Sequence, residues 1–121
     1  MKKIIAVKFY HTESGNEPVR EWLKSLDKAD SRAIGFDIKT AEEGWPIGMP
    51  LIKKIDSENK LYEVRTDLNT DKISRVIFTV YKNCMILLHG LIKKDQKLRK
   101  KDKDLAIKRS KKFNKGKCDE K

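Results

Sequence analysis

The fold is decided by residues 61–92, which read LYEVRTDLNTDKISRVIFTVYKNCMILLHGLI. Apolar side chains recur here with a period of two, which is typical of β-strands. Polar pairs at 70–71 and 82–83 interrupt the alternation, and such pairs are typical of turns. The segment therefore predicts a meander of three strands over residues 61–69, 73–81 and 84–92.

The middle strand carries apolar groups on both of its faces. Val76, Phe78 and Val80 share one face, whereas Ile77 and Tyr81 share the other. A strand that is apolar on both faces is expected to be covered on both sides.

The segments outside the meander supply helices and one more strand. A strand is predicted over residues 4–10. Val19, Trp22, Leu23 and Leu26 follow at i, i+3, i+4 and i+7, the spacing of one helical face. A second helix over residues 31–43 completes a helical hairpin, and Lys53 and Lys54 lie in the loop that leads into the sheet.

The last apolar pattern is helical and begins near Lys101. Its stripe of Leu105, Ala106, Arg109 and Phe113 is thin, so this helix must dock on the sheet or on a partner. We predict an α+β fold in which an N-terminal strand and a helical hairpin pack on a small, mostly antiparallel sheet, with a basic C-terminal helix over about 101–113. Residues 1–113 form a single domain, and 114–121 form a frayed polar tail.

Positive charge is concentrated at the C-terminus. Residues 93–121 contain 14 Lys and Arg but five Asp and Glu, a net charge of +9 out of +11 for the whole chain. A near-neutral body with a basic segment is typical of a protein that meets a polyanion, and nucleic acid is the first candidate. The alternative is a solvated, lysine-rich tail that aids solubility.

Several classes of protein are not expected from this sequence. No stretch approaches the roughly 20 apolar residues of a membrane span, and Lys8 interrupts the short apolar run at 4–7. Cys84 and Cys118 lie outside any CxxC pair, so we expect reduced thiols in a soluble, cytoplasmic protein. A glycine-rich phosphate loop, an HExxH motif and a Cys/His cluster are all missing, so no metal or cofactor is expected.

Two arginines are the sharpest candidates for chemistry. With a turn near 70–71, Arg65 pairs with about position 76, so the side chains of Arg65 and Arg75 come close together. Two guanidinium groups repel each other unless an anion lies between them, and a phosphate fits the planar donors of arginine. Alternatively, Glu63 or an Asp neutralises both in ordinary salt bridges on the sheet surface. His89, on the next strand, is either bonded to the backbone or a general acid or base.

Longer motifs in the chain carry a resemblance to a known family. LYEVRT, SRVIFTVYKNCMILLHGLIKKDQK and DLAIKRSKKF, preceded by PVREWLKSL and AEEGWPIGMPLIKKI, resemble the phage-type HigB toxins of the RelE/ParE superfamily. The resemblance covers about residues 4–113. It implies a RelE-like fold and the activity of a ribosome-dependent mRNA endonuclease, or mRNA interferase, which needs no metal.

The resemblance also implies roles for particular residues. Arg65 and Arg75 would hold the scissile phosphate while Lys93 and Lys94 stabilise its charge, and one of these lysines or His89 would transfer protons. Substrate or ribosomal RNA would be bound by Lys53, Lys54, His89, Gln96, Lys97, Lys100, Lys101 and Arg109. The implied partners are a HigA-like helix-turn-helix antitoxin, the decoding site of the 30S subunit with its rRNA, and mRNA.

The chain departs from the family pattern at four positions. Leu91 replaces a phenylalanine, Asp95 replaces a threonine, and Leu98–Arg99 replace a Thr-Pro pair. Asp95 brings a negative charge into the expected anion site. Two other functions stay open: a non-enzymatic ParE-like toxin that inhibits gyrase, and a phage-derived nucleic-acid-binding protein without catalysis.

Overall fold

The computed structural model describes residues 5–46, 48, 51–68, 71–93 and 98–116 and has three helices and five strands. This confirms the α+β class and is consistent with the RelE-like fold that the resemblance implies. In chain order the elements are β1 (Ala6–Phe9), α1 (Pro18–Lys24), α2 (Lys28–Gly44), β2 (Ile52–Asp56), β3 (Leu61–Asp67), β4 (Ile73–Tyr81), β5 (Cys84–Lys93) and α3 (Lys100–Gly116).

The strands form one mixed sheet in the order β1-β5-β4-β3-β2. β1 runs parallel to β5, and all other neighbours are antiparallel. The predicted meander of β3, β4 and β5 is confirmed. The expectation that Lys53 and Lys54 lie in a loop is wrong, because these residues belong to the edge strand β2. Adjacent lysines hide the alternation of so short a strand, and charged residues of this kind are common on sheet edges.

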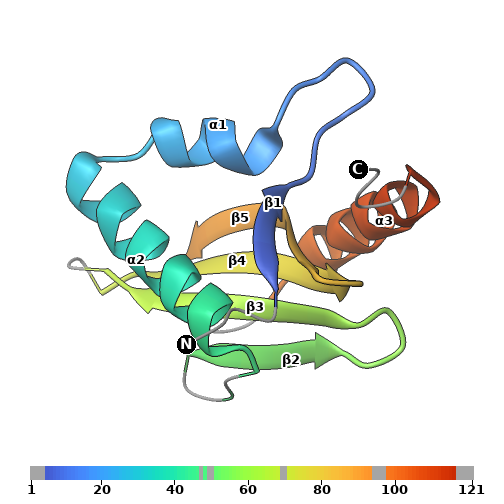
Figure 1. Ribbon diagram of the computed structural model, residues 1–121. Coiled ribbons are helices and arrows are strands. Elements are labelled where there is room, and N and C mark those ends of the chain that lie inside the picture. The colour runs from blue at the N-terminus through green and yellow to red at the C-terminus, as the bar shows by residue number, and fades with distance from the viewer. Residues whose placement is uncertain (1–4, 47, 49–50, 69–70, 94–97, 117–121) are drawn as a thin grey trace.

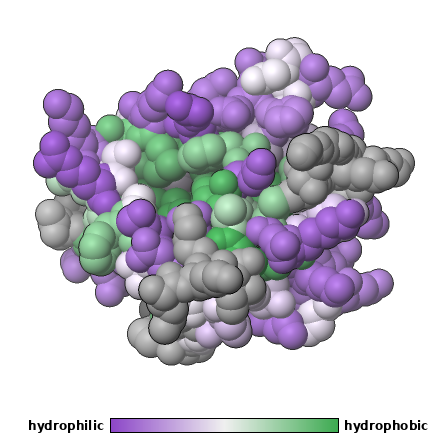
Figure 2. Space-filling view, viewed as in Figure 1, coloured by the Kyte–Doolittle hydropathy of each residue, from purple (hydrophilic) through white to green (hydrophobic). Residues whose placement is uncertain are grey.

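One face of the sheet is covered by the helical hairpin (Figure 1). Val19 of α1 and Ile34, Ile38 and Ala41 of α2 pack against strand residues such as Phe78, all of them buried. α2 begins at Lys28, earlier than expected. Figure 2 shows apolar residues gathered in the middle of the molecular face that it displays, with hydrophilic residues around them.

The opposite face is covered by α3 (Figure 1). Ala106 is fully buried against Ile77, Ile86 and Leu88, so the docking of this helix is resolved in favour of the sheet. A register shift leaves Leu88 as an extra residue in β5 beside Ile77 and Phe78. Leu87 packs under the hairpin and Leu88 under α3, as ordinary alternation requires, and the extra residue brings His89, the partner of Ile77, to the α3 face as well. α3 continues to Gly116, past the expected end at 113.

Two further features of β5 bear on the fold. Gly90 lies against Trp22 of α1 so closely that a Cβ atom at Gly90 would be 2.4 Å from the indole ring. Cys84, at the start of β5, is disulfide-bonded, so the expectation of a reduced thiol is wrong at this position. The expectation for Cys118, like that for the tail at 117–121, falls outside the described residues. In the described part of the chain no helix is long and apolar enough to cross a membrane.

Candidate functional site

Arg65 and Arg75 lie directly opposite each other on the antiparallel strands β3 and β4. The register differs by one residue from the expected pairing of Arg65 with about position 76. Directly paired residues project from the same face of a sheet. Arg65 follows Leu61 at an even spacing, and Leu61 is buried in the cluster beneath α3. Both arginines therefore project from the α3 face.

Glu63 lies next to both arginines on this face. Its Oε2 atom is 3.7 Å from Nε of Arg65, and its Oε1 atom is 3.6 Å from Nη1 of Arg75. Glu63 thus forms an ion pair with each arginine, and its single negative charge offsets one of their two positive charges. Both separations are longer than a hydrogen bond, and neither carboxylate oxygen makes a hydrogen bond within the described residues.

Burial dominates the electrostatics of this carboxyl group. Glu63 is completely buried, and the loss of hydration raises its pKa above the usual value. The positive charges of Arg75, Arg65 and Lys53 oppose that rise, in decreasing order. The three basic groups thus compensate only part of the cost of burying the carboxylate. Protonation of Glu63 would leave a more strongly cationic cluster.

The two arginines differ in how far they reach the surface. The Arg75 side chain is 2% exposed, whereas that of Arg65 is 18% exposed. Arg65 can therefore meet a ligand directly, whereas Arg75 and Glu63 beside it are enclosed by the protein. We define the arginine site as Glu63, Arg65 and Arg75.

Lys53 and Lys93 border the arginine site, but Lys54 does not. Lys53 pairs with Glu63, and Lys93 pairs with Ile73, two residues before Arg75. By the alternation of strands both lysines project from the α3 face. Lys54 pairs with Tyr62 and faces the other side of the sheet. Sequence reasoning placed Lys53 and Lys54 together, and the strand separates them because neighbouring residues point to opposite faces.

Within the described residues, the contact that His89 makes is to a carboxylate and not to the backbone. Its Nε2 atom is 2.8 Å from Oδ1 of Asp102 in the first turn of α3. His89 pairs with Ile77, so it is the diagonal neighbour of Arg75 across β4 and β5. Sequence reasoning did not single out Asp102, because nothing local shows that the start of α3 returns to β5.

Arg109 has a structural role that its sequence position did not reveal. Its Nη1 atom donates a 2.7 Å hydrogen bond to the carbonyl oxygen of Leu88, and its guanidinium lies 5.6 Å from the ring centre of Tyr10. Burial lowers the pKa of Arg109, and the charge of Tyr10 opposes this. The Arg109 guanidinium thus helps to fix α3 on the sheet, and the expectation that it also binds rRNA stays a prediction.

The other expected cations fall into two groups. Lys100 and Lys101 are exposed at the start of α3, where Lys100 pairs with Asp104 at 2.9 Å. Lys94, Gln96 and Lys97 lie outside the described residues, as does Asp95. Among the residues that are described, His, Cys, Asp and Glu side chains do not gather in threes as metal ligands would.

Residues 21–111 match the family described as Phage derived protein Gp49-like (DUF891). The chain belongs to this Gp49-like family. It is a toxin-like family of the RelE/HigB type. The match begins within α1 and ends within α3, and it includes the whole arginine site and the His89–Asp102 pair. No curated protein matches the chain.

Proposed function

We propose that this Gp49-like protein is the toxin of a type II toxin–antitoxin system and acts as a ribosome-dependent mRNA endonuclease. The observation that carries the proposal is the direct pairing of Arg65 with Arg75 beside the buried Glu63. Membership of the Gp49-like family supports the assignment as a toxin, and the net positive charge supports RNA as the target. The proposed location is the cytoplasm, where ribosomes are found.

The proposed reaction is internal to the RNA chain. The 2′-hydroxyl attacks the adjacent phosphorus, the bond to the 5′-oxygen breaks, and the products carry a cyclic phosphate and a free 5′-hydroxyl. Negative charge accumulates on the phosphoryl oxygens in the transition state. Fixed cations near those oxygens stabilise that charge more than they stabilise the substrate.

The exposure of each side chain in the site indicates what it can contribute to this reaction. Arg65 reaches the surface and would contact the scissile phosphate, and Lys93 lies on the same face as the diagonal neighbour of Arg75. Arg75 and Glu63 are buried and would orient the Arg65 side chain. The charge of Arg75 would also add to the positive electrostatic field at the phosphate. The expected contributions of Lys94, Gln96 and Lys97 remain part of the proposal through the resemblance.

Two protons must also move during the reaction. One leaves the attacking 2′-hydroxyl, and one reaches the departing 5′-oxygen. His89 is a candidate for one transfer, since it is a diagonal neighbour of Arg75 and Asp102 holds its ring. Lys93 and Lys94 are the other candidates.

The proposed partners follow from the same function. The ribosome would position mRNA, and Lys53, Lys100 and Lys101 would contact RNA backbone by charge, without regard to sequence. A HigA-like helix-turn-helix antitoxin would hold the toxin inactive until it is needed.

The test is primer extension on one mRNA in a purified translation system, with and without ribosomes. We compare the wild type, Arg65→Gln, and the matched control Arg32→Gln, which alters an exposed arginine on α2. Arg75 is not used, because removing a buried charge of a pair costs about 3–5 kcal/mol. We expect cuts that require ribosomes, persist in Arg32→Gln and fall at least about 100-fold in Arg65→Gln. Equal cutting by Arg65→Gln would refute the site, and inhibition of gyrase by a wild type that does not cut would favour the ParE-like alternative.

A further inference from the structure

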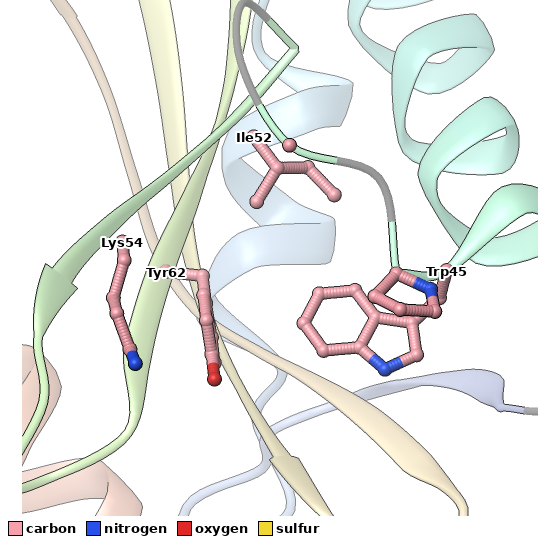
Figure 3. A pocket seen from close by; sticks show the side chains of 6 residues that line it. Trp45, Ile52, Lys54 and Tyr62 are labelled. Carbon is pink, nitrogen blue, oxygen red and sulfur yellow. The ribbon is translucent and has the colours of Figure 1, made fainter.

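A hollow lies on the hairpin side of the sheet, where the end of α2 meets β2 and β3 (Figure 3). It has a volume of about 240 Å³ and is lined by Trp45, Pro46, Gly48, Ile52, Lys54 and Tyr62. Figure 3 shows Tyr62 between Lys54 and Trp45. The ammonium of Lys54, the hydroxyl of Tyr62 and the indole nitrogen of Trp45 all lie on the side away from Ile52. We call this feature the aromatic hollow.

The rings of the aromatic hollow are held in place by their neighbours. The centre of the Trp45 ring is 5.1 Å from that of Tyr62 and 5.7 Å from that of Phe78, at steep angles to both. Tyr62 in turn stacks on Phe78 at 5.4 Å. Trp45 and Tyr62 nevertheless remain half-buried and not fully enclosed. Rings that are fixed and still partly exposed lose little freedom when a planar ligand binds.

The chemistry of the rim indicates what kind of ligand fits. The Lys54 ammonium and the Trp45 indole N–H are hydrogen-bond donors only, and the Tyr62 hydroxyl can donate or accept. The hollow therefore suits a flat group with acceptors and a negative charge nearby. Its volume is below the roughly 300–1,000 Å³ of pockets for drug-sized ligands. One planar ring system with its attached sugar is the appropriate size.

We propose that the aromatic hollow binds one nucleobase of single-stranded RNA, with the Lys54 ammonium against the adjoining phosphate. The net charge of +11 favours a polyanion over an uncharged ligand. Aromatic side chains next to a cation are the usual platform for unpaired bases, because every base presents a face that can stack. The choice of RNA rests on the proposed function.

The edge strand β2 connects the aromatic hollow with the arginine site. Lys53 pairs with Glu63 on the α3 face, and the adjacent Lys54 pairs with Tyr62 on the opposite face. β2 is the last strand in the sheet order. A flexible single strand that crosses this edge can therefore place a phosphate near Arg65 and, a few nucleotides away, a base in the aromatic hollow. The hollow would fix the substrate beyond the cleavage point.

The first experiment reads binding from Trp45 alone. Because the chain has two tryptophans, Trp22→Phe leaves Trp45 as the single reporter. The probes are AMP, CMP, GMP and UMP, their uncharged nucleosides, and N-acetyltyrosinamide. We expect at least one nucleotide to quench the fluorescence. Lys54→Met should weaken binding of that nucleotide several-fold and leave binding of its nucleoside unchanged, whereas Lys28→Met, at the opposite end of α2 from the hollow, should leave both unchanged.

A second measurement uses the wild-type chain, in case Trp22→Phe disturbs the fold. A short RNA with one 5-iodouridine is irradiated with the protein, and the cross-linked peptide is identified by mass spectrometry. Attachment at Trp45 or Tyr62 supports the proposal. Attachment elsewhere alone, or the absence of quenching by all four nucleotides, would overturn it. Tighter binding of N-acetyltyrosinamide than of any nucleotide would also overturn it and assign the hollow to a protein side chain.

These readouts are separate from cleavage. If the protein is not a nuclease, nucleotides will still quench Trp45, provided that the hollow binds bases. If the hollow does not bind bases, ribosome-dependent cutting that requires Arg65 will still be observed.

Discussion

His89 on β5 and Asp102 in the first turn of α3 are joined by a contact of 2.8 Å between Nε2 and Oδ1. The two side chains are only 19% and 14% exposed. The contact links the start of the basic helix to the strand that borders the arginine site. α3 is fixed a second time by the bond from Arg109 to the carbonyl of Leu88. The basic helix is therefore a part of the fold and also a carrier of charge.

The first prediction concerns the strength of the His89–Asp102 contact. We expect a double-mutant cycle of His89→Ala and Asp102→Ala to give a coupling energy of about 1 kcal/mol in urea unfolding, because both groups are largely buried. The control cycle is Lys100→Ala with Asp104→Ala. That pair has a similar separation of 2.9 Å but is 88% and 54% exposed, so its coupling should stay below about 0.5 kcal/mol. Equal couplings would show that burial does not strengthen the contact.

The second prediction concerns the approach of Trp22 to Gly90. Gly90→Ala should destabilise the fold by about 1–3 kcal/mol, because the added methyl group meets the indole ring and forces α1 away from β5. The matched control is Gly35→Ala on the exposed side of α2, where a methyl group meets nothing within 4 Å. Alanine is favoured over glycine in a helix by about 1 kcal/mol, so this control should be more stable than wild type. Urea unfolding followed by circular dichroism measures both, and two changes of the same sign would contradict the packing argument.

The patterns of long, periodic segments predicted most of the fold. The alternation over 61–92 predicted β3, β4 and β5, because each strand is long enough to show a period of two. The helical spacing from Val19 to Leu26 predicted α1. β2 was not predicted, because its five residues contain two adjacent lysines. It also lies at the sheet edge, where packing places little constraint on the side chains. Parallel pairing of β1 with β5 depends on residues far apart in the chain, which no local pattern encodes.

The candidate site was predictable where it depends on register alone. The turn at 70–71 placed Arg65 within one residue of its partner Arg75. Contacts between distant elements were not predictable, because they depend on how α3 docks. Asp102 meets His89, and Arg109 turns toward Leu88, only once that helix lies on the sheet. The separation of Lys53 from Lys54 was missed together with the strand that causes it.

The third prediction concerns Glu63 and pH. Because burial raises the pKa of Glu63, the folded state holds its proton more tightly than the unfolded state does. The resulting stability is fully present below the usual value of 4.5 and is lost as pH rises through the folded pKa. Glu63→Gln mimics the protonated form, so its stability relative to wild type should increase as pH rises above 4.5. The measurement is urea unfolding of both proteins from pH 4 to pH 8.

Asp56 provides a control of opposite sign for this measurement. A hydrogen bond from the backbone N–H of Asn59 lowers the pKa of Asp56, and burial opposes this. Its stabilising contribution is present above the usual value of 3.8 and is lost as pH falls through the lower folded pKa. Asp56→Asn should therefore lose stability relative to wild type as pH rises from the acid range. If the stability of Glu63→Gln relative to wild type also falls as pH rises, the attraction of the arginines outweighs the cost of burial at Glu63.

The last prediction concerns the start of the basic helix and follows from the proposed function. Lys101 is exposed in the first turn of α3, near the His89–Asp102 contact that borders the arginine site. If Lys101 contacts RNA phosphate, Lys101→Gln should weaken binding to rRNA fragments of unrelated sequence by a similar factor. It should also reduce the slope of log affinity against log salt by about one.

Lys28→Gln makes the same change of charge at an exposed position in the first turn of α2, on the other side of the sheet. Fluorescence anisotropy over a range of salt concentrations compares the two variants. Equal losses from both would mean that RNA responds to net charge alone, whereas a loss confined to Lys101→Gln would place the RNA on the face that carries Arg65.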